Sequence, residues 1–249
     1  MMKILNLIIL LLLSNSVLSQ KKNKKNIYPH STSAEQRLKG YNDRLNLNSK
    51  SIVKNISFRN IGPTVMSGRV VDLDINPDDP SHFYVAYASG GLWETKNHGN
   101  SFVSLFDNQM VMTIGDIKVD WQNDIIYVGS GENNSSRSSY SGNGIYKSVD
   151  NGKSWDNIGL HESHHIGRII IHPQNPDIIW VASLGHLYSS SNERGIYKSL
   201  DGGLTWTNKL YVNDYTGAID LVIDENNPEI LYASMWEKDR KAWNFDGSG

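Results

Sequence analysis

The sequence predicts an all-β protein built from a repeated, four-stranded antiparallel unit. Three observations lead to this fold class. An octapeptide of the form Ser/Thr-x-Asp/Asn-x-Gly-x-Ser/Thr-aromatic occurs three times, and its copies at 95–102, 148–155 and 199–206 begin 53 and 51 residues apart. Short runs rich in Ile, Val, Tyr and Trp fill each interval. Turns containing Asn, Pro or Gly separate these runs, as expected of short strands in a repeat protein.

The octapeptide predicts a tight turn between two strands. Its Asp or Asn accepts hydrogen bonds from nearby backbone N–H groups, and its Gly takes the positive φ that other residues resist. Because turn chemistry explains every position, we interpret the motif as structural. The residues concerned are Asn97, Gly99, Asp150, Gly152, Trp155, Asp201, Gly203 and Trp206.

The N-terminal part of the chain differs from the rest. Residues 1–19 combine Lys3, an apolar run over 4–13 and a stretch of small residues, which is the pattern of a secretory signal peptide. The apolar run is shorter than the roughly 20 residues that a membrane-spanning helix needs. Residues 20–50 are basic and polar, so we expect an exposed leader or linker there. The mature chain is therefore predicted to be secreted or periplasmic, without a membrane span.

Residues 51–249 divide into predicted strands at their turn residues. After a lone strand over 58–63, the first unit is expected to contain strands 69–75, 83–88, 91–95 and 101–106. The strands expected in the second unit are 114–120, 125–130, 144–148 and 154–158. Those of the third are 166–172, 178–183, 195–199 and 205–210, and the fourth offers 218–224 and 230–236.

Four short strands per repeat are typical of a β-propeller blade. The sequence therefore predicts about three and a half blades over 51–249, with no octapeptide in the fourth. Propellers close with roughly four to eight blades. We expect an incomplete ring, truncated in the fourth blade.

Several segments together resemble one family of proteins. The octapeptide resembles the Asp-box, or bacterial neuraminidase repeat (BNR), of sialidase, sortilin and xyloglucanase-type propellers. The chain is similar to exported bacterial propellers that share a sortilin N-terminal-like domain and are often labelled glycosyl hydrolases. The segments that carry this resemblance are 58–63, 90–93, 129–132, 194–199 and 231–237. The resemblance implies a propeller with structural Asp-box turns, and it transfers no catalytic residue to this chain.

Charge excludes one class of partner. Residues 1–50 hold nine Lys and Arg against two Asp and Glu, which leaves 15 basic and 24 acidic residues, a net charge of −9, in 51–249. Nucleic-acid binding needs a basic face, so no nucleic-acid partner is expected. The chain has no Cys, which rules out thiol chemistry and cysteine-based metal sites.

The first strand of each blade is expected to line the central channel, and several of these strands begin with Gly and a charged residue. The pairs are Gly68-Arg69, Gly115-Asp116 and Gly167-Arg168, while Asp220 follows Gly217 in the fourth unit. Arg69 and Arg168 are candidate ligand-binding residues at the channel. The competing interpretation is that these charges hold one another in ion pairs.

Glu132 is the third candidate ligand-binding residue, because it precedes a polar loop rich in Ser and Asn. Glycoside hydrolysis needs a second carboxylate about 5 to 9.5 Å away. Asp116 is the nearest candidate in a neighbouring register. Glu132 and Asp116 are therefore the candidate catalytic pair, although an interaction between Glu132 and loop amides also fits the sequence.

His161, His164 and His165 lie within five residues of one another. Three such side chains can bind zinc, but only Glu162 is at hand as a further ligand, and the spacing favours hydrogen-bonding loop histidines. We expect no metal and no cofactor. The predicted function is a secreted binding module for a protein, peptide or glycan, and the alternative is a glycoside hydrolase that uses a carboxylate pair.

Overall fold

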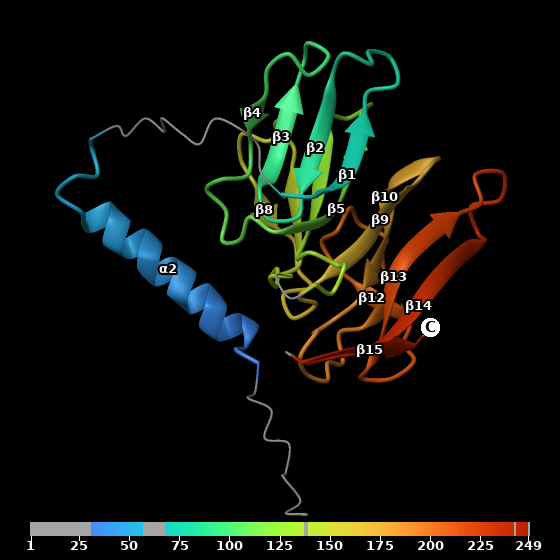
Figure 1. Ribbon diagram of the computed structural model, residues 1–249. Helices are drawn as coiled ribbons and strands as arrows, with labels where there is room; N and C mark the ends of the chain where they lie inside the picture. Colours follow the sequence, from blue (N-terminus) through green and yellow to red (C-terminus); the bar gives the residue numbers. More distant parts are fainter. Residues whose placement is uncertain (1–30, 57–67, 137–138, 242, 249) are drawn as a thin grey trace, which may run out of the picture. The chain divides into compact units, whose positions relative to one another are not determined.

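A computed structural model describes residues 31–56, 68–136, 139–241 and 243–248 of the chain (Figure 1). The predicted signal peptide over 1–19 and the predicted lone strand over 58–63 lie outside these residues. The described residues belong to one structural unit. Within the described residues, no helix has both the length and the apolar character needed to cross a membrane.

Helix α2, Ala34–Lys50, begins the described part of the chain. Ser33 caps its N-terminus, because the Ser33 hydroxyl accepts a hydrogen bond from the backbone N–H of Gln36. This helix lies in residues 20–50, which the sequence pattern predicts to be an exposed leader or linker, without a helix. The helix has no continuous apolar face, and of its residues only Ala34 is buried. The Ser33-x-x-Gln36 capping box was the local signal available to predict it.

Strands β1 to β12 form three four-stranded antiparallel sheets with consecutive strand order. The first sheet contains β1 (Val70–Ile75), β2 (Phe83–Tyr87), β3 (Gly91–Thr95) and β4 (Val103–Ser104). The second contains β5 (Ile114–Asp120), β6 (Ile125–Ser130), β7 (Ile145–Ser148) and β8 (Asp156–Asn157). The third contains β9 (Ile166–His172), β10 (Asn175–Ser183), β11 (Gly195–Ser199) and β12 (Thr207–Leu210).

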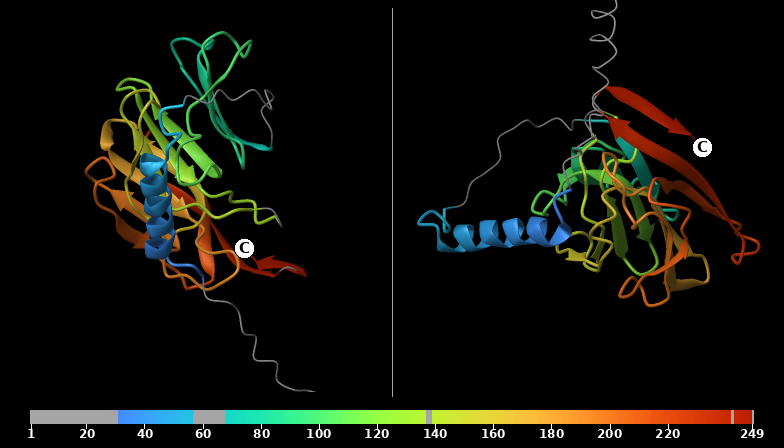
Figure 2. Two further views of the ribbon diagram at one scale, coloured as in Figure 1. Left: turned by 90° about the vertical axis from the view of Figure 1, so that its left-hand side faces the viewer. Right: turned by 90° about the horizontal axis from the view of Figure 1, so that it is seen from below.

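The fourth sheet has three strands in the described residues: β13 (Thr216–Ile223), β14 (Leu231–Lys241) and β15 (Asn244–Ser248). The last strand predicted for this unit ends at residue 236, whereas β14 continues to Lys241 and pairs with β15. The first strands β1, β5, β9 and β13 lie beside one another in that order (Figures 1 and 2). The described residues therefore form three complete blades and a partial one, and they do not close a ring.

The apolar core lies between adjacent sheets. Tyr84 and Leu92 of the first sheet, and Phe106 just after it, pack with Ile117 and Val128 of the second sheet. Two further clusters, whose fully or nearly buried members include Ile166, Val181, Ala182 and Leu221, join the second sheet to the third and the third to the fourth. Neighbouring blades thus bury apolar residues against one another, as expected of a repeat architecture.

The glycine at the start of β5 allows two blades to approach closely. A Cβ atom on Gly115 would lie 2.0 Å from the carbonyl oxygen of Ile166 on β9. A Cβ on Gly167 would likewise lie 2.2 Å from the carbonyl oxygen of Ile219. Backbone cannot move away as a flexible side chain can, so these first strands require Gly.

Candidate functional site

The octapeptide turns join the third and fourth strands of their blades and tie neighbouring blades together. In the second blade, Asp150 accepts hydrogen bonds from the hydroxyls of Ser148 and Ser154 at 2.8 and 2.6 Å, and from the Ser154 backbone N–H. The Trp155 indole N–H donates to the carbonyl of Leu105 in the preceding blade, at 2.9 Å. Asp201 and Trp206 make the corresponding contacts in the third blade.

These bonds keep the aspartates charged. The hydrogen bond from the Ser154 hydroxyl, with the Ser154 backbone N–H, lowers the pKa of Asp150 to about 2. The hydroxyls of Thr205 and Ser199 lower the pKa of Asp201 to about 2. A carboxylate whose acceptor positions are filled by its own turn is a structural group.

One polar residue on each first strand occupies an equivalent place, next to a β-bulge. The irregularities fall directly before Asp72 in β1, Asp116 in β5, Arg168 in β9 and Asp220 in β13. A bulge adds a residue to one strand and redirects the side chain that follows it. The four blades therefore place three carboxylates and one guanidinium along neighbouring strands, and we call these residues the charged row.

Arg168 is the cation at the centre of the charged row. Its Nη1 lies 2.9 Å from Oδ1 of Asp116, and its Nε donates to Oδ1 of Asp220 at 2.8 Å. Asp116 also accepts a hydrogen bond from the backbone N–H of Ile169, at 2.6 Å. Arg168 thus forms ion pairs with Asp116 and Asp220, as the sequence suggested. Arg69, the other cation expected to alternate with these residues, is instead paired with Glu132, and Asp72 takes the equivalent place on the first strand.

The members of the charged row differ in their access to solvent. The Asp116 side chain is 2% exposed, whereas those of Arg168 and Asp220 are 38% and 48% exposed. Burial, together with the nearby Asp72 carboxylate, holds the pKa of Asp116 well above its usual range. Asp72, Arg168 and Asp220 of the charged row line an open pocket of about 460 Å³ with Lys118 and the apolar side chains of β9 and β13. This volume lies in the range of ligand pockets.

Glu132 and Arg69 form an ion pair between the first two blades. The Glu132 side chain is 1% exposed, while that of Arg69 is 51% exposed. The backbone carbonyl of Glu132 also lies 2.6 Å from Nδ1 of His165. From the sequence, Glu132 was expected either to face a ligand from a loop or to bond loop amides. In the structure it is buried and paired with Arg69.

Glu132 and Asp116, the candidate catalytic pair, are each paired with a different arginine. Arg69 neutralises Glu132, and Arg168 neutralises Asp116. The carboxylate that helps to raise the pKa of Asp116 belongs to Asp72 and not to Glu132. Asp72 was not among the candidate residues. Both candidates are buried, so neither side chain offers a free carboxylate to a sugar from solvent.

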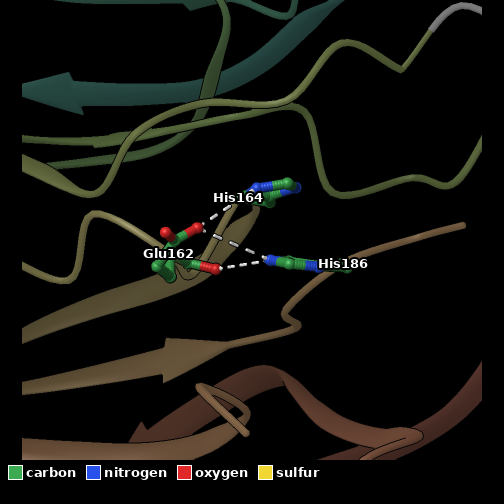
Figure 3. Close-up of side chains that lie close together, drawn as sticks. All are labelled: Glu162, His164 and His186. Atoms are coloured by element: carbon green, nitrogen blue, oxygen red, sulfur yellow. Dashed lines mark hydrogen bonds and ion pairs between the residues drawn. The ribbon is translucent and has the colours of Figure 1, made fainter. Parts of the chain in front are cut away.

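Two residues of the loop before β9, Glu162 and His164, form a second cluster with His186 of the loop after β10. His186 was not among the residues singled out from the sequence. Nε2 of His164 lies 3.8 Å from Oε2 of Glu162, and Nε2 of His186 lies 4.0 Å from the same oxygen (Figure 3). The His164 and His186 rings stack with their centroids 3.6 Å apart. We call Glu162, His164 and His186 the histidine cluster.

The remaining loop histidines have other roles. His165 is buried and bonded to the Glu132 carbonyl, and Nδ1 of His161 lies 3.4 Å from the Asn143 carbonyl. Burial, with His186 and Arg37 nearby, lowers the pKa of His164 to about 2, and burial also lowers the pKa of His186. The imidazoles of the histidine cluster are therefore neutral at physiological pH.

Helix α2 reaches the histidine cluster through its first turn. Arg37 donates hydrogen bonds to the carbonyls of Gly142 and His161 at 2.6 and 2.8 Å, and its Nη2 lies 3.4 Å from Oε2 of Glu162. The backbone N–H of Ala34 also donates to Glu162. The carboxylate of Glu162 therefore belongs both to the helix contact and to the histidine cluster.

Comparisons with known proteins identify the fold. No protein-family model matches this chain, and no curated protein matches it. The chain is similar to the crystal structure of an ancestral GH74 enzyme, with a TM-score of 0.54 and 20% identity, over 70% of this chain and 23% of that one. A GH74 xyloglucanase from Xanthomonas campestris gives a TM-score of 0.50 and 16% identity, over 70% of this chain and 29% of that one. YCF48 from Cyanidioschyzon merolae gives a TM-score of 0.40 and 17% identity, over 58% of this chain and 38% of that one.

The chain thus spans less than a third of the length of the two GH74 structures. At these identities the likeness concerns the fold. It confirms the predicted β-propeller architecture and its relation to xyloglucanase-type propellers at that level.

Proposed function

We propose that this chain is part of an exported Asp-box β-propeller, with a sortilin N-terminal-like arrangement of blades, that binds a protein, peptide or glycan ligand. Export rests on the signal-peptide pattern of residues 1–19, which predicts a secreted or periplasmic protein. The Asp-box assignment is supported by the hydrogen bonds of Asp150 and Asp201 with their own turns. The expected partners include no nucleic acid.

The proposal rests on one observation: Arg168 is held by two carboxylates and is still partly exposed at a pocket. Asp116 and Asp220 fix its guanidinium from two sides, yet 38% of the side chain remains exposed at the 460 Å³ pocket. A held guanidinium loses little conformational entropy when it binds, and its planar donors suit carboxylate and hydroxyl groups of peptides or glycans. Asp220 adds an exposed acceptor beside it, and β9 and β13 add apolar surface.

Ligand binding is preferred to hydrolysis as the function because the two candidate catalytic carboxylates, Glu132 and Asp116, are buried and paired. A glycosidase needs two carboxyl groups that reach the glycosidic bond from either side. Glu132 and Asp116 are buried, and each has its own arginine partner. These features support a structural use of both side chains, so glycoside hydrolysis stays the alternative.

Arrays of glycans and peptides probed with the full-length protein test the proposal. Any glycan that binds is then incubated with the protein, and the release of reducing sugar is measured. Retention of a ligand without turnover supports a binding module. Turnover that is lost in Glu132→Gln supports the hydrolase instead, and pull-down of a stable protein partner without array signals supports a scaffold role.

A further inference from the structure

The histidine cluster has an unusual arrangement for loop side chains. Nε2 of His164 is buried and has no hydrogen-bond partner among the described residues. A buried polar atom without a partner costs roughly 1 to 3 kcal/mol. His164 also has a φ of 57°, which is uncommon for a residue other than Gly and often marks a functional site. The protein therefore keeps an imidazole nitrogen in this position although no group in the described part of the chain satisfies it.

The ligand atoms of the cluster lie close to the spacing that a metal ion requires. The Nε2 atoms of His164 and His186 and a carboxylate oxygen of Glu162 all lie within 4.8 Å of one another. In a tetrahedral zinc site with bonds of about 2.0 to 2.1 Å, ligand atoms lie roughly 3.3 Å apart. The distances from Oε2 of Glu162 to Nε2 of His164, 3.8 Å, and to Nε2 of His186, 4.0 Å, are slightly longer than this spacing. Rotation of the two rings out of their stack would make their lone pairs converge on one ion.

His186 has a hydrogen-bond partner at each ring nitrogen. Its Nδ1 lies 2.8 Å from the hydroxyl of Ser189, and its Nε2 lies 3.0 Å from the Glu162 carbonyl. Because a carbonyl oxygen only accepts, Nε2 carries the proton in this arrangement. Zinc binding would replace this hydrogen bond and move the proton to Nδ1, which would then donate to Ser189. Such an outer hydrogen bond, which sets the tautomer and the ring orientation, accompanies most histidine ligands of metals.

A fourth coordination position can be reached from solvent. Glu162 and His186 line an open pocket of about 420 Å³ together with Ser33, Asn192 and Asp214. Zinc sites with three protein ligands complete their tetrahedron with water. Two neutral imidazoles and one carboxylate form a ligand set that favours zinc over magnesium and calcium, which prefer oxygen ligands.

We propose that Glu162, His164 and His186 bind one zinc ion, with water from the adjoining pocket as the fourth ligand. The ion would join the connection between β8 and β9 to the connection between β10 and β11. It would share the Glu162 carboxylate with the first turn of helix α2. Arg37 would keep its two carbonyl contacts, since they do not involve this carboxylate. The site does not depend on the proposed ligand-binding function.

Titration of the metal-free, untagged full-length protein with zinc chloride in a calorimeter tests this site. We expect one zinc per chain, and we expect His164→Gln and His186→Gln to weaken binding by about 100-fold each. His161→Gln is the matched control, because His161 lies in the same loop and outside the cluster, and its affinity should equal that of the unchanged protein. Far-UV circular dichroism without metal checks that each variant folds.

Cobalt substitution of the unchanged protein gives a readout that needs no variant. A single cobalt bound by two imidazoles, a carboxylate and water should give the intense visible absorption of a tetrahedral site. Absence of zinc binding to the folded protein, an octahedral cobalt spectrum, or equal loss of affinity in His161→Gln and His164→Gln would each overturn the proposal.

Discussion

Nη1 of Arg168 on β9 lies 2.9 Å from Oδ1 of Asp116 on β5, so one ion pair joins the first strands of two neighbouring blades. Asp220 on β13 holds the same guanidinium from the other side, at 2.8 Å. This chain of contacts connects three blades, and its Arg168 and Asp220 side chains line a pocket and are partly accessible to solvent. It therefore links the stability of the propeller to its proposed binding surface.

Removal of the guanidinium should destabilise the protein through Asp116. We expect Arg168→Met to lower the free energy of unfolding by about 2 kcal/mol at neutral pH, below the 3 to 5 kcal/mol of a fully buried pair because Arg168 is partly exposed. Combination with Asp116→Asn should restore part of this loss, because the unpaired buried charge is then absent. Urea unfolding of the two single variants and the double variant measures the coupling, and strictly additive losses would show that the pair does not interact.

The pH dependence of stability should reveal the protonation of Asp116. Because its folded pKa is raised, the group's contribution to stability is complete below the unfolded pKa of about 3.9 and is lost as pH rises through the folded pKa. The stability of the unchanged protein relative to Asp116→Asn should therefore fall as pH rises above about 4. Urea unfolding over a pH series measures this difference.

Asp220→Asn is the matched comparison for this pH series. Burial opposes the shift, but the hydrogen bond and charge of Arg168 lower the pKa of Asp220. Its contribution is therefore present above its unfolded pKa and lost as pH falls through the folded one. Relative stability should change in the opposite direction to that of Asp116→Asn, and equal slopes would contradict the assigned protonation states.

The indole of the octapeptide should contribute to the contact between blades. Trp155→Phe removes the N–H that the Leu105 carbonyl, at 2.9 Å, and the Gly152 carbonyl, at 3.1 Å, share as acceptors. It keeps an aromatic ring against Phe106. We expect a loss of about 1 kcal/mol, the usual net value of one hydrogen bond, with some further loss of packing. Thermal unfolding measures it. An unchanged midpoint would show that this hydrogen bond does not stabilise the blade contact.

A methyl group at the start of β5 should separate two blades. Gly115→Ala would place a Cβ 2.0 Å from the Ile166 carbonyl, and we expect a loss of about 3 kcal/mol or more. Gly40→Ala is the control, because no atom lies within 4 Å of its added Cβ in helix α2. That change should stabilise the helix by about 0.5 to 1 kcal/mol. Similar effects of both substitutions would contradict the close approach at Gly115.

The strand pattern could be predicted because turn chemistry is local. Turn residues mark the ends of strands such as β5 and β9, whose bounds agree with the predicted ranges. β10 begins at Asn175, three residues before its predicted start at 178. The fourth strands of the first two blades were predicted too long, since β4 and β8 contain two residues each. Residues 154 and 155 contact Asp150 and the preceding blade as parts of the turn, so the ladder starts only after them.

The candidate site could be predicted only in part, because its contacts join distant blades. Alternation of charge at Asp116, Arg168 and Asp220 suggested ion pairs, since a fixed repeat period places equivalent residues side by side. The partner of Glu132 could not be identified, as Arg69 lies in another blade. His186 was missed for the same reason: it approaches Glu162 through the loop after β10, and its own sequence neighbours contain no further histidine.

Calorimetric titration of an array-selected ligand into the full-length protein tests the central claim most directly. The account predicts saturable binding without turnover and at least about tenfold weaker affinity in Arg168→Gln, equivalent to about 1.4 kcal/mol. Lys209→Gln, a change at an exposed cation on β12, should leave affinity unchanged. Equal affinity in Arg168→Gln and the unchanged protein, or turnover that disappears in Glu132→Gln, would contradict binding through the charged row.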